Sequence, residues 1–294
     1  MKKNVPRFQR RPEQVGSLNL QERDLEIVKL VHDYRFLDTG QIQALIGSSY
    51  QATLRRLRKL FHHGFLERPP AQLYLAWFKP RKMVYALGDR GADLLAEKYG
   101  IDTGKTKWRR KNIEAKYRYM EHTLMISNVR ACLNLALENP PESRLLFWER
   151  ENRELRDQVY FRERARKRRL PIVPDGFFAI EDKGDDIHFF LEADRGTMTN
   201  RRFLNKMRAY WQWWRQGGHE NRFGIKAFRV LTVTNTEKRK ENLRRTTKKA
   251  DQKQIGSLMF WFTSEERFDL SEPEGILEPI WQTPKNDRWH SILE

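Results

Sequence analysis

The chain has 294 residues, with 57 Lys and Arg against 39 Asp and Glu and a formal net charge of +18 at pH 7. Its length suggests two domains of about 150 residues, and an aromatic share of 12 % argues against a disordered polyelectrolyte. No apolar run approaches the roughly 20 residues of a membrane helix, no apolar secretory segment follows the basic start, and the single cysteine, Cys132, excludes a disulfide framework. We therefore expect a soluble, cytoplasmic protein that binds a polyanion and no membrane.

The charge is unevenly distributed along the chain. Residues 201–250 hold 15 Lys and Arg against three Asp and Glu, whereas residues 151–200 hold ten against eleven. Residues 251–294 are acidic, with four Lys and Arg against nine Asp and Glu. Residues 51–150 form a second basic block, with 20 Lys and Arg against ten Asp and Glu. The two basic blocks flank residues 151–200, which are rich in Asp and Glu, and this pattern predicts nucleic-acid contacts arranged around a carboxylate pocket.

Residues 20–100 are predicted to form a winged helix-turn-helix. Ile27, Val31 and Tyr34 share one face of a first helix, Asp38 or Thr39 can cap a second, and Gly47 can end it. A third helix follows, with an apolar face and a basic face. Its predicted DNA contacts are Ser48, Gln51, Arg55, Arg56 and Lys59.

Two strands, at residues 65–68 and 83–87, would then form a wing. The loop between them carries the predicted phosphate contacts Lys79, Arg81 and Lys82. The alternative is a three-helix structural module whose basic face is an ordinary solvated surface.

The remaining chain predicts a second, α/β domain in an α+β protein. Its elements run in the order helix (from about residue 114 to 137), three strands, helix, strand, helix and strand. This order resembles the PD-(D/E)xK, or restriction-endonuclease-like, fold. The predicted organisation is a basic flexible arm at 1–19, the winged helix-turn-helix at 20–100, an exposed linker at 101–112, the PD-(D/E)xK-like domain at 113–264 and an acidic tail at 265–294.

Three carboxylates stand where this fold has its metal site. Asp175 precedes one strand, and Glu192 and Asp194 share a face at the end of the next. Together they would bind Mg²⁺, which activates water for phosphodiester hydrolysis. Asp194 replaces the usual Lys, and Lys206 on the following helix is the candidate substitute. The alternatives are a scaffold that has lost catalysis and a purely structural role.

In the structural alternative, Asp175 caps a turn and Asp194 pairs with Arg195 or Arg202. Further basic residues are candidate DNA contacts on a hairpin tip and on a helix near residues 238–249, with solvated surfaces as the alternative. They are Arg166, Lys167, Arg168, Arg169, Arg244 and Arg245.

Aromatic side chains crowd one helix of the second domain. Tyr210, Trp211, Trp213 and Trp214 cannot all face one core, so at least one marks a domain or dimer interface. A homodimer is one candidate assembly, because winged-helix proteins commonly bind two-fold DNA sites as dimers. No phosphate-binding Gly-rich loop and no His-apolar-His triplet occurs, which argues against an ATPase and a relaxase.

From Leu20 to about Phe262, the chain resembles the replication-relaxation family of plasmid and mobile-element proteins. The resemblance rests on RFLDTGQIQALIG, VYALGDRGADLL, YMEHTLMISNVRACL and FFLEADRGTM. It implies a role in plasmid replication or DNA relaxation, in contact with that machinery. We therefore expect a duplex DNA-binding protein that acts in replication, relaxation or their transcriptional control. The alternative is a Mg²⁺-dependent DNA nuclease.

Overall fold

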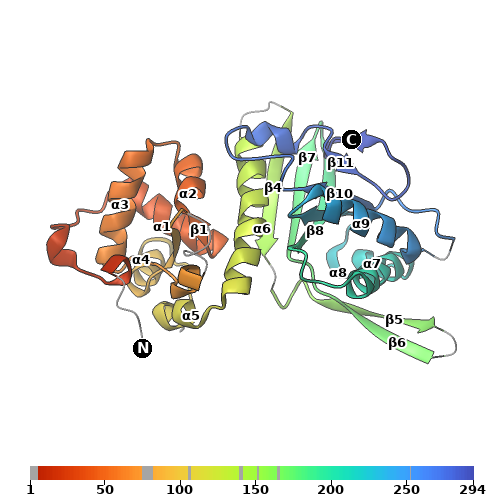
Figure 1. The fold of residues 1–294 in the computed structure, drawn as a ribbon, viewed down its shortest axis with the longest axis horizontal. Coiled ribbons are helices and arrows are strands. Elements are labelled where there is room, and N and C mark those ends of the chain that lie inside the picture. Colours follow the sequence, from red (N-terminus) through yellow and green to blue (C-terminus); the bar gives the residue numbers. More distant parts are fainter. Residues whose placement is uncertain are drawn as a thin grey trace. The chain divides into compact units, whose positions relative to one another are not determined.

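The computed structural model of the chain describes residues 6–74, 82–104, 107–138, 142–150, 152–163, 166–251 and 253–294. It divides into two compact units, Met1–Asn128 and Val129–Glu294, which we call the amino-terminal and carboxy-terminal units. The boundary falls within helix α6 (Tyr117–Ala136). Both units combine helices with a sheet (Figure 1), which confirms the α+β class.

The amino-terminal unit alternates short strands with helices. Its elements are α1 (Glu22–Tyr34), β1 (Leu37–Asp38), α2 (Thr39–Ile46), α3 (Tyr50–His62), β2 (Leu66–Glu67), β3 (Val84–Leu87), α4 (Asp89–Tyr99) and α5 (Trp108–Glu114). The strands form an antiparallel sheet in the order β1-β3-β2. Fully buried Ile27, Val31, Leu57 and Leu60 pack α1 and α3 into one core.

Local capping residues determine where α2 and α3 begin and end. The Asp38 carboxylate accepts hydrogen bonds from the backbone N–H groups of Gly40 (2.7 Å) and Gln41 (2.9 Å) at the start of α2. Gly47 ends this helix with a φ of 64°, which glycine adopts without strain. Ser49 then caps α3. The predicted cap at Asp38 and the predicted end at Gly47 are confirmed.

Residues 101–112 differ from the exposed linker that we expected, because α5 begins at Trp108. Trp108 and Asn112 are buried. Asn112 donates a hydrogen bond to the Leu87 carbonyl (2.8 Å) and accepts one from Arg35 (2.6 Å). These contacts attach α5 to the core of the amino-terminal unit.

The carboxy-terminal unit is built around a mixed sheet. Its elements after α6 are β4 (Ser143–Arg150), β5 (Asp157–Glu163), β6 (Arg166–Ile172), β7 (Gly176–Asp182), β8 (Asp185–Asp194), α7 (Asn200–Arg215), α8 (Gly218–Phe223), β9 (Arg229–Thr234), α9 (Glu237–Thr247), β10 (Phe260–Ser264), β11 (Trp281–Gln282) and β12 (Trp289–His290). The sheet order is β12-β11-β10-β9-β8-β7-β4, and β5 and β6 form a separate hairpin.

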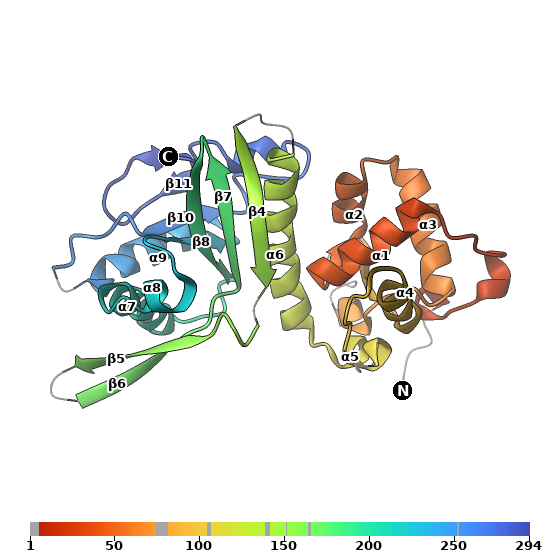
Figure 2. The same cartoon turned by 180° about the vertical axis from the view of Figure 1, so that it is seen from behind.

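Helices connect the parallel strands of this sheet. β8 pairs in parallel with β9, and β9 with β10, while the other neighbouring strands are antiparallel. α7 and α8 make the first crossover and α9 makes the second. Figures 1 and 2 show α7 and α9 on one face of the sheet and the carboxy-terminal part of α6 on the other. Phe190, Phe203, Tyr210 and Trp213 form the aromatic core on the α7 face.

Residues 265–294, whose composition predicts an acidic tail, contribute β11 and β12 to the sheet. Ile276, Trp281 and Ile292 are fully buried. The acidic composition of this segment reflects its exposed positions, and its few apolar side chains fix it to the unit.

Candidate functional site

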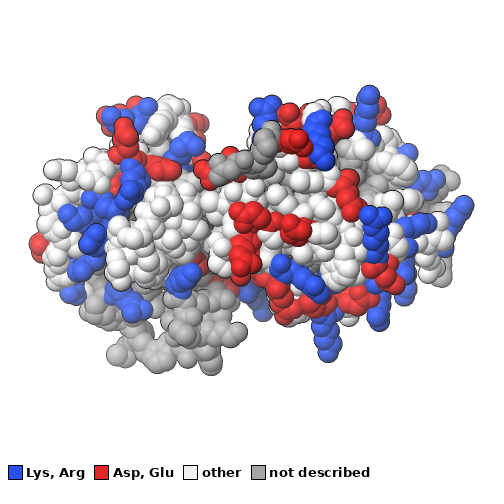
Figure 3. Space-filling view, turned by 90° about the horizontal axis from the view of Figure 1, so that it is seen from above, with Lys and Arg blue, Asp and Glu red and all other residues white. Residues whose placement is uncertain are grey.

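The outer face of α3 presents a short row of polar side chains. Gln51, Arg55 and Arg58 are exposed. Ser48 is half-buried, and its hydroxyl shares a hydrogen bond of 2.8 Å with that of Thr53. Figure 3 shows Lys and Arg side chains gathered over the side of the amino-terminal unit where α3 lies in Figure 1. This face can contact a polyanion.

Arg56 lies on the same helix but has a structural partner. Its guanidinium donates two hydrogen bonds to the fully buried Asp24 carboxylate, one of them from Nε at 2.7 Å. Asp24 also accepts the backbone N–H of Gln21 and so caps α1. The Arg56 guanidinium therefore joins α3 to the start of α1 and is engaged within the protein.

The segment before α1 packs along the carboxy-terminal half of α3. Lys59 Nζ donates to the Ser17 carbonyl (3.3 Å), and His63 Nε2 lies 2.8 Å from the Gly16 carbonyl. The backbone N–H of Arg11 donates to His62 Nδ1 (2.8 Å). Residues 11–17, within the predicted flexible arm, therefore have defined contacts that no sequence pattern indicated.

The predicted wing is described only in part. Lys79 and Arg81 lie outside the described residues. Lys82 is exposed, and its side chain lies against Gly40 at the start of α2.

In the carboxy-terminal unit, a buried cluster surrounds Glu192 at the end of β8. Lys206 forms an ion pair with Glu192 Oε2, and the Tyr210 hydroxyl donates to Glu192 Oε1 at 2.7 Å. Lys206 and Tyr210 are four residues apart on α7 and therefore share a face. Asp175 accepts the backbone N–H of Ala193 at 2.8 Å. The structure thus brings together three of the four predicted catalytic residues, Asp175, Glu192 and Lys206.

Burial dominates the electrostatics of Glu192, which is 3 % exposed. Removal from water raises the pKa of Glu192 to about 7, and the negative charge of Asp175 acts in the same direction. The Lys206 ammonium and the Tyr210 hydroxyl oppose this rise because they stabilise the carboxylate.

Asp194 is separated from this cluster by its own partner. Arg239 on α9 donates to both carboxylate oxygens of Asp194, at 2.8 and 3.0 Å, and to the Met198 carbonyl at 2.6 Å. Asp194 also accepts the backbone N–H of Gly196. The structural alternative names Arg195 or Arg202 as the partner of Asp194, but the partner is Arg239. Its planar guanidinium joins Asp194 to the Met198 carbonyl and so fixes the loop that follows β8.

These contacts do not fit a divalent cation. The oxygens that would bind Mg²⁺ in Glu192 and Asp194 already accept hydrogen bonds from an ammonium, a phenol and a guanidinium. Among the residues that the structure describes, no group of three or more His, Cys, Asp or Glu side chains is arranged to hold a metal ion. The arrangement supports ion pairing between β8, α7 and α9.

The predicted basic hairpin is present as β5 and β6, which extend past α7 (Figure 1). Arg168 and Arg169 are exposed. Arg166 and Lys167 lie nearer the turn, and their side chains are outside the described part of the structure. Their strand positions still place the positive charge toward the tip.

Arg244 and Arg245 on α9 have different surroundings. Arg245 is exposed and pairs with Glu241. Arg244 is 6 % exposed and donates to the carbonyls of Thr283 and Asn286, both at 3.0 Å. These contacts bury the Arg244 guanidinium against the C-terminal segment, so it has a structural role there.

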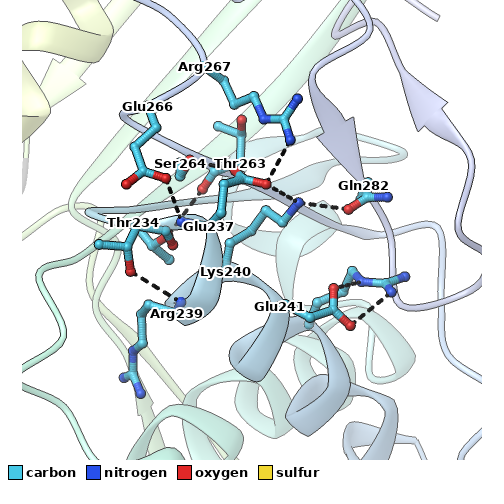
Figure 4. A network of polar contacts seen from close by, with 12 residues as sticks. Thr234, Glu237, Arg239, Lys240, Glu241, Thr263, Ser264, Glu266, Arg267 and Gln282 are labelled. Atoms are coloured by element: carbon cyan, nitrogen blue, oxygen red, sulfur yellow. Dashed lines mark hydrogen bonds and ion pairs between the residues drawn. The ribbon is translucent and has the colours of Figure 1, made fainter.

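The amino-terminal turn of α9 anchors the same segment (Figure 4). Buried Lys240 donates to Glu237 (3.0 Å) and to Gln282 (2.7 Å). Partial burial opposes the ionisation of Glu237, but hydrogen bonds from Arg267, Ser264 and Lys240 lower its pKa to about 2. The sequence of α9 suggests a helix of exposed cations, but two of these cations, Lys240 and Arg244, attach the C-terminal segment to the helix.

Comparisons with known proteins give one match. A family profile described as replication-relaxation matches residues 28–227, about two thirds of the chain. No curated protein and no solved structure matches. Within the described residues, no helix is long and apolar enough to cross a membrane. The match runs from within α1 to beyond α8 and includes both the α3 face and the Glu192 cluster, so the chain belongs to the replication-relaxation family.

Proposed function

We propose that the protein binds duplex DNA through a winged helix-turn-helix in its amino-terminal unit and acts in the replication or relaxation of a plasmid or other mobile element. The family supports the replication theme. The observation that carries the DNA-binding part is the element order α1-β1-α2-α3-β2-β3 with an antiparallel β1-β3-β2 sheet. In a winged helix of this order, α3 is the helix that enters the major groove.

The exposed residues of α3 suit base recognition. Gln51 can pair with the donor and acceptor of adenine, and Arg55 can donate two hydrogen bonds to guanine. Arg58 on α3 and Lys82 before β3 are exposed in the same unit and would bind phosphates. Lys79 and Arg81 remain proposed wing contacts on the basis of the sequence alone.

Fluorescence anisotropy with a labelled duplex from the DNA beside the protein's own gene tests this proposal. The double variant Gln51→Ala/Arg55→Ala removes two base contacts worth roughly 1–3 kcal/mol each, so its affinity should fall by at least about 30-fold. Arg110→Ala is the matched control, because Arg110 is exposed on α5 and pairs only with exposed Glu114 among its described contacts. Equal affinity of parent and double variant would remove α3 as the recognition helix.

For the carboxy-terminal unit, we propose a PD-(D/E)xK-like scaffold without a metal site. The strand and helix order agrees with that fold, while Lys206, Tyr210 and Arg239 occupy the carboxylate oxygens that a metal would need. Incubation of supercoiled plasmid with the protein and Mg²⁺ or Mn²⁺ should then leave the plasmid intact. Nicking by the parent that Glu192→Ala abolishes would establish the nuclease alternative instead.

A further inference from the structure

Two adjoining hollows open on the carboxy-terminal unit beside the last turns of α7. The first, of about 400 Å³, is lined among others by His188, Trp211, Trp214, Phe228 and Leu258. The second, of about 240 Å³, is lined by Trp211, Arg215, Asp251, Lys253, Ile255 and Gly256. Trp211 belongs to both. The first hollow lies at the starting ends of β8 and β9, whereas Glu192 and Asp194 lie at the far end of β8.

The walls of these hollows expose large apolar side chains. Trp214 is 42 % exposed, Leu258 55 % and Ile255 57 %. The rings of Trp211 and Trp214 lie 5.4 Å apart at 34° to each other. Contiguous exposed apolar surface of this kind marks a binding site, and flat rings at its edge suit a flat, stackable ligand.

Charged side chains border the aromatic surface. Exposed Asp186 and half-buried Arg229 line the first hollow. Arg215 and Lys253 are exposed and line the second hollow. The side chain of Gln216, directly after α7, donates to the Tyr160 carbonyl at 2.9 Å, and Tyr160 pairs across the hairpin with exposed Arg169. The basic hairpin therefore lies beside the end of α7 that carries Trp214.

A buried acceptor adds polar chemistry to the second hollow. Asp251 is 7 % exposed, and one carboxylate oxygen accepts the backbone N–H of Gly256 at 3.0 Å. The other oxygen, Oδ1, has no hydrogen-bond partner within the described ranges, from which the neighbouring residue 252 is missing. A buried acceptor of this kind favours a ligand that brings an N–H donor.

We propose that these two hollows form a binding site for single-stranded DNA. Unpaired bases stack on Trp214 and Trp211, and Arg215 and Lys253 bind the phosphates between them. An amino or imino group of a base donates to Asp251. The site is separate from the duplex contacts proposed for α3, and it would hold strands that opening of a duplex exposes.

Charge favours DNA over a second copy of the chain. A two-fold interface places each patch against itself. It would bring Arg215 and Lys253 of both copies together in a chain of net charge +18, which repels itself, whereas a DNA strand supplies the opposite charge.

Fluorescence anisotropy of the full chain with labelled oligothymidylate of about 15 nucleotides tests the site. Trp214→Ala should weaken binding by roughly 5- to 100-fold, the effect of losing base stacking. Tyr99→Ala, which removes an aromatic ring of similar exposure (49 %) from the amino-terminal unit, should leave the affinity unchanged. Thermal unfolding of Trp214→Ala should match the parent, because this ring is half exposed.

A strand of abasic residues with the same number of phosphates should bind the parent weakly and should be insensitive to Trp214→Ala. Equal binding of abasic and thymidine strands, or unchanged thymidine binding by Trp214→Ala, would overturn the proposal. A change from dimer to monomer in light scattering, with unchanged thymidine affinity, would assign the patch to a second copy. The Gln51→Ala/Arg55→Ala variant should retain thymidine binding, so failure of the duplex proposal remains distinguishable.

Discussion

Replacement of Glu192 by Gln tests whether burial controls the charge at the end of β8. Gln keeps the shape of the side chain but cannot titrate. Its single carbonyl oxygen can accept a hydrogen bond from Lys206 or from Tyr210, and its amide nitrogen takes the place of the other carboxylate oxygen. Burial raises the pKa of Glu192 from 4.5 to about 7. The folded protein therefore holds this proton more tightly than the unfolded chain does.

The sign of the effect follows from that difference. Between pH 4.5 and 7, the native state binds more protons at Glu192 than the unfolded chain does. Each increase of one pH unit in this range therefore lowers the free energy of unfolding by about 1.4 kcal/mol. The stabilisation by the protonated carboxyl is fully present below pH 4.5 and is lost as the pH rises through 7. The total loss is about 3 kcal/mol.

Urea unfolding at several pH values measures this loss. Seven of the nine tryptophans lie in the carboxy-terminal unit, so their fluorescence follows mainly its unfolding. The free energy of unfolding of Glu192→Gln, relative to the parent, should rise by about 3 kcal/mol from about pH 4 to about pH 8. Glu278→Gln, at an exposed position, is the control. A difference that is constant with pH, or that falls, would refute the role of burial.

Two further predictions concern α9. Arg239→Met leaves the buried Asp194 carboxylate without its ion-pair partner, and thermal unfolding should show a loss of about 3–5 kcal/mol in the free energy of unfolding. Arg239→Lys should not restore this stability, because Lys lacks the planar fork that donates to both carboxylate oxygens. Full restoration by Lys would contradict the role of the fork. Ionised Glu237 contributes stability that is present above pH 4.5 and is lost as the pH falls to about 2. Glu237→Gln should therefore flatten the acid limb of the stability curve in circular dichroism, and an unchanged limb would contradict the lowered pKa.

Short-range signals in the sequence predicted local structure well. Asp38 and Gly47 bound α2 because a cap and a left-handed glycine act within three or four residues. The contact of Lys206 with Glu192 also agrees with the sequence hypothesis, because a helix that directly follows a strand packs back onto it.

Long-range pairing was not predictable in the same way. The Arg239 partner of Asp194 is 45 residues away, and Arg244 donates to acceptors in residues 283–287 as well as to Glu241 on its own helix. Both cations belong to a run that composition alone presents as a solvated, DNA-facing helix. Periodicity gives the face of a helix on which a residue lies, but it does not say what covers that face. Within the acidic segment 265–294, the short strands had too few apolar residues to be recognised.

The contacts of the C-terminal segment also affect the order in which the protein can fold during synthesis. The amino-terminal unit has its sheet complete once β3 has been made, and it can fold while later residues are added. In the carboxy-terminal unit, three cations donate hydrogen bonds to acceptors that are synthesised last: Lys240 to Gln282, Arg244 to the Thr283 carbonyl, and Arg229 to the Ile292 carbonyl. Until those residues leave the ribosome, Lys240, Arg244 and Arg229 lack these partners. The finished unit buries the first two of these cations and half-buries the third. A chain that stalls before that point would therefore expose their positive charge to any polyanion in the cell.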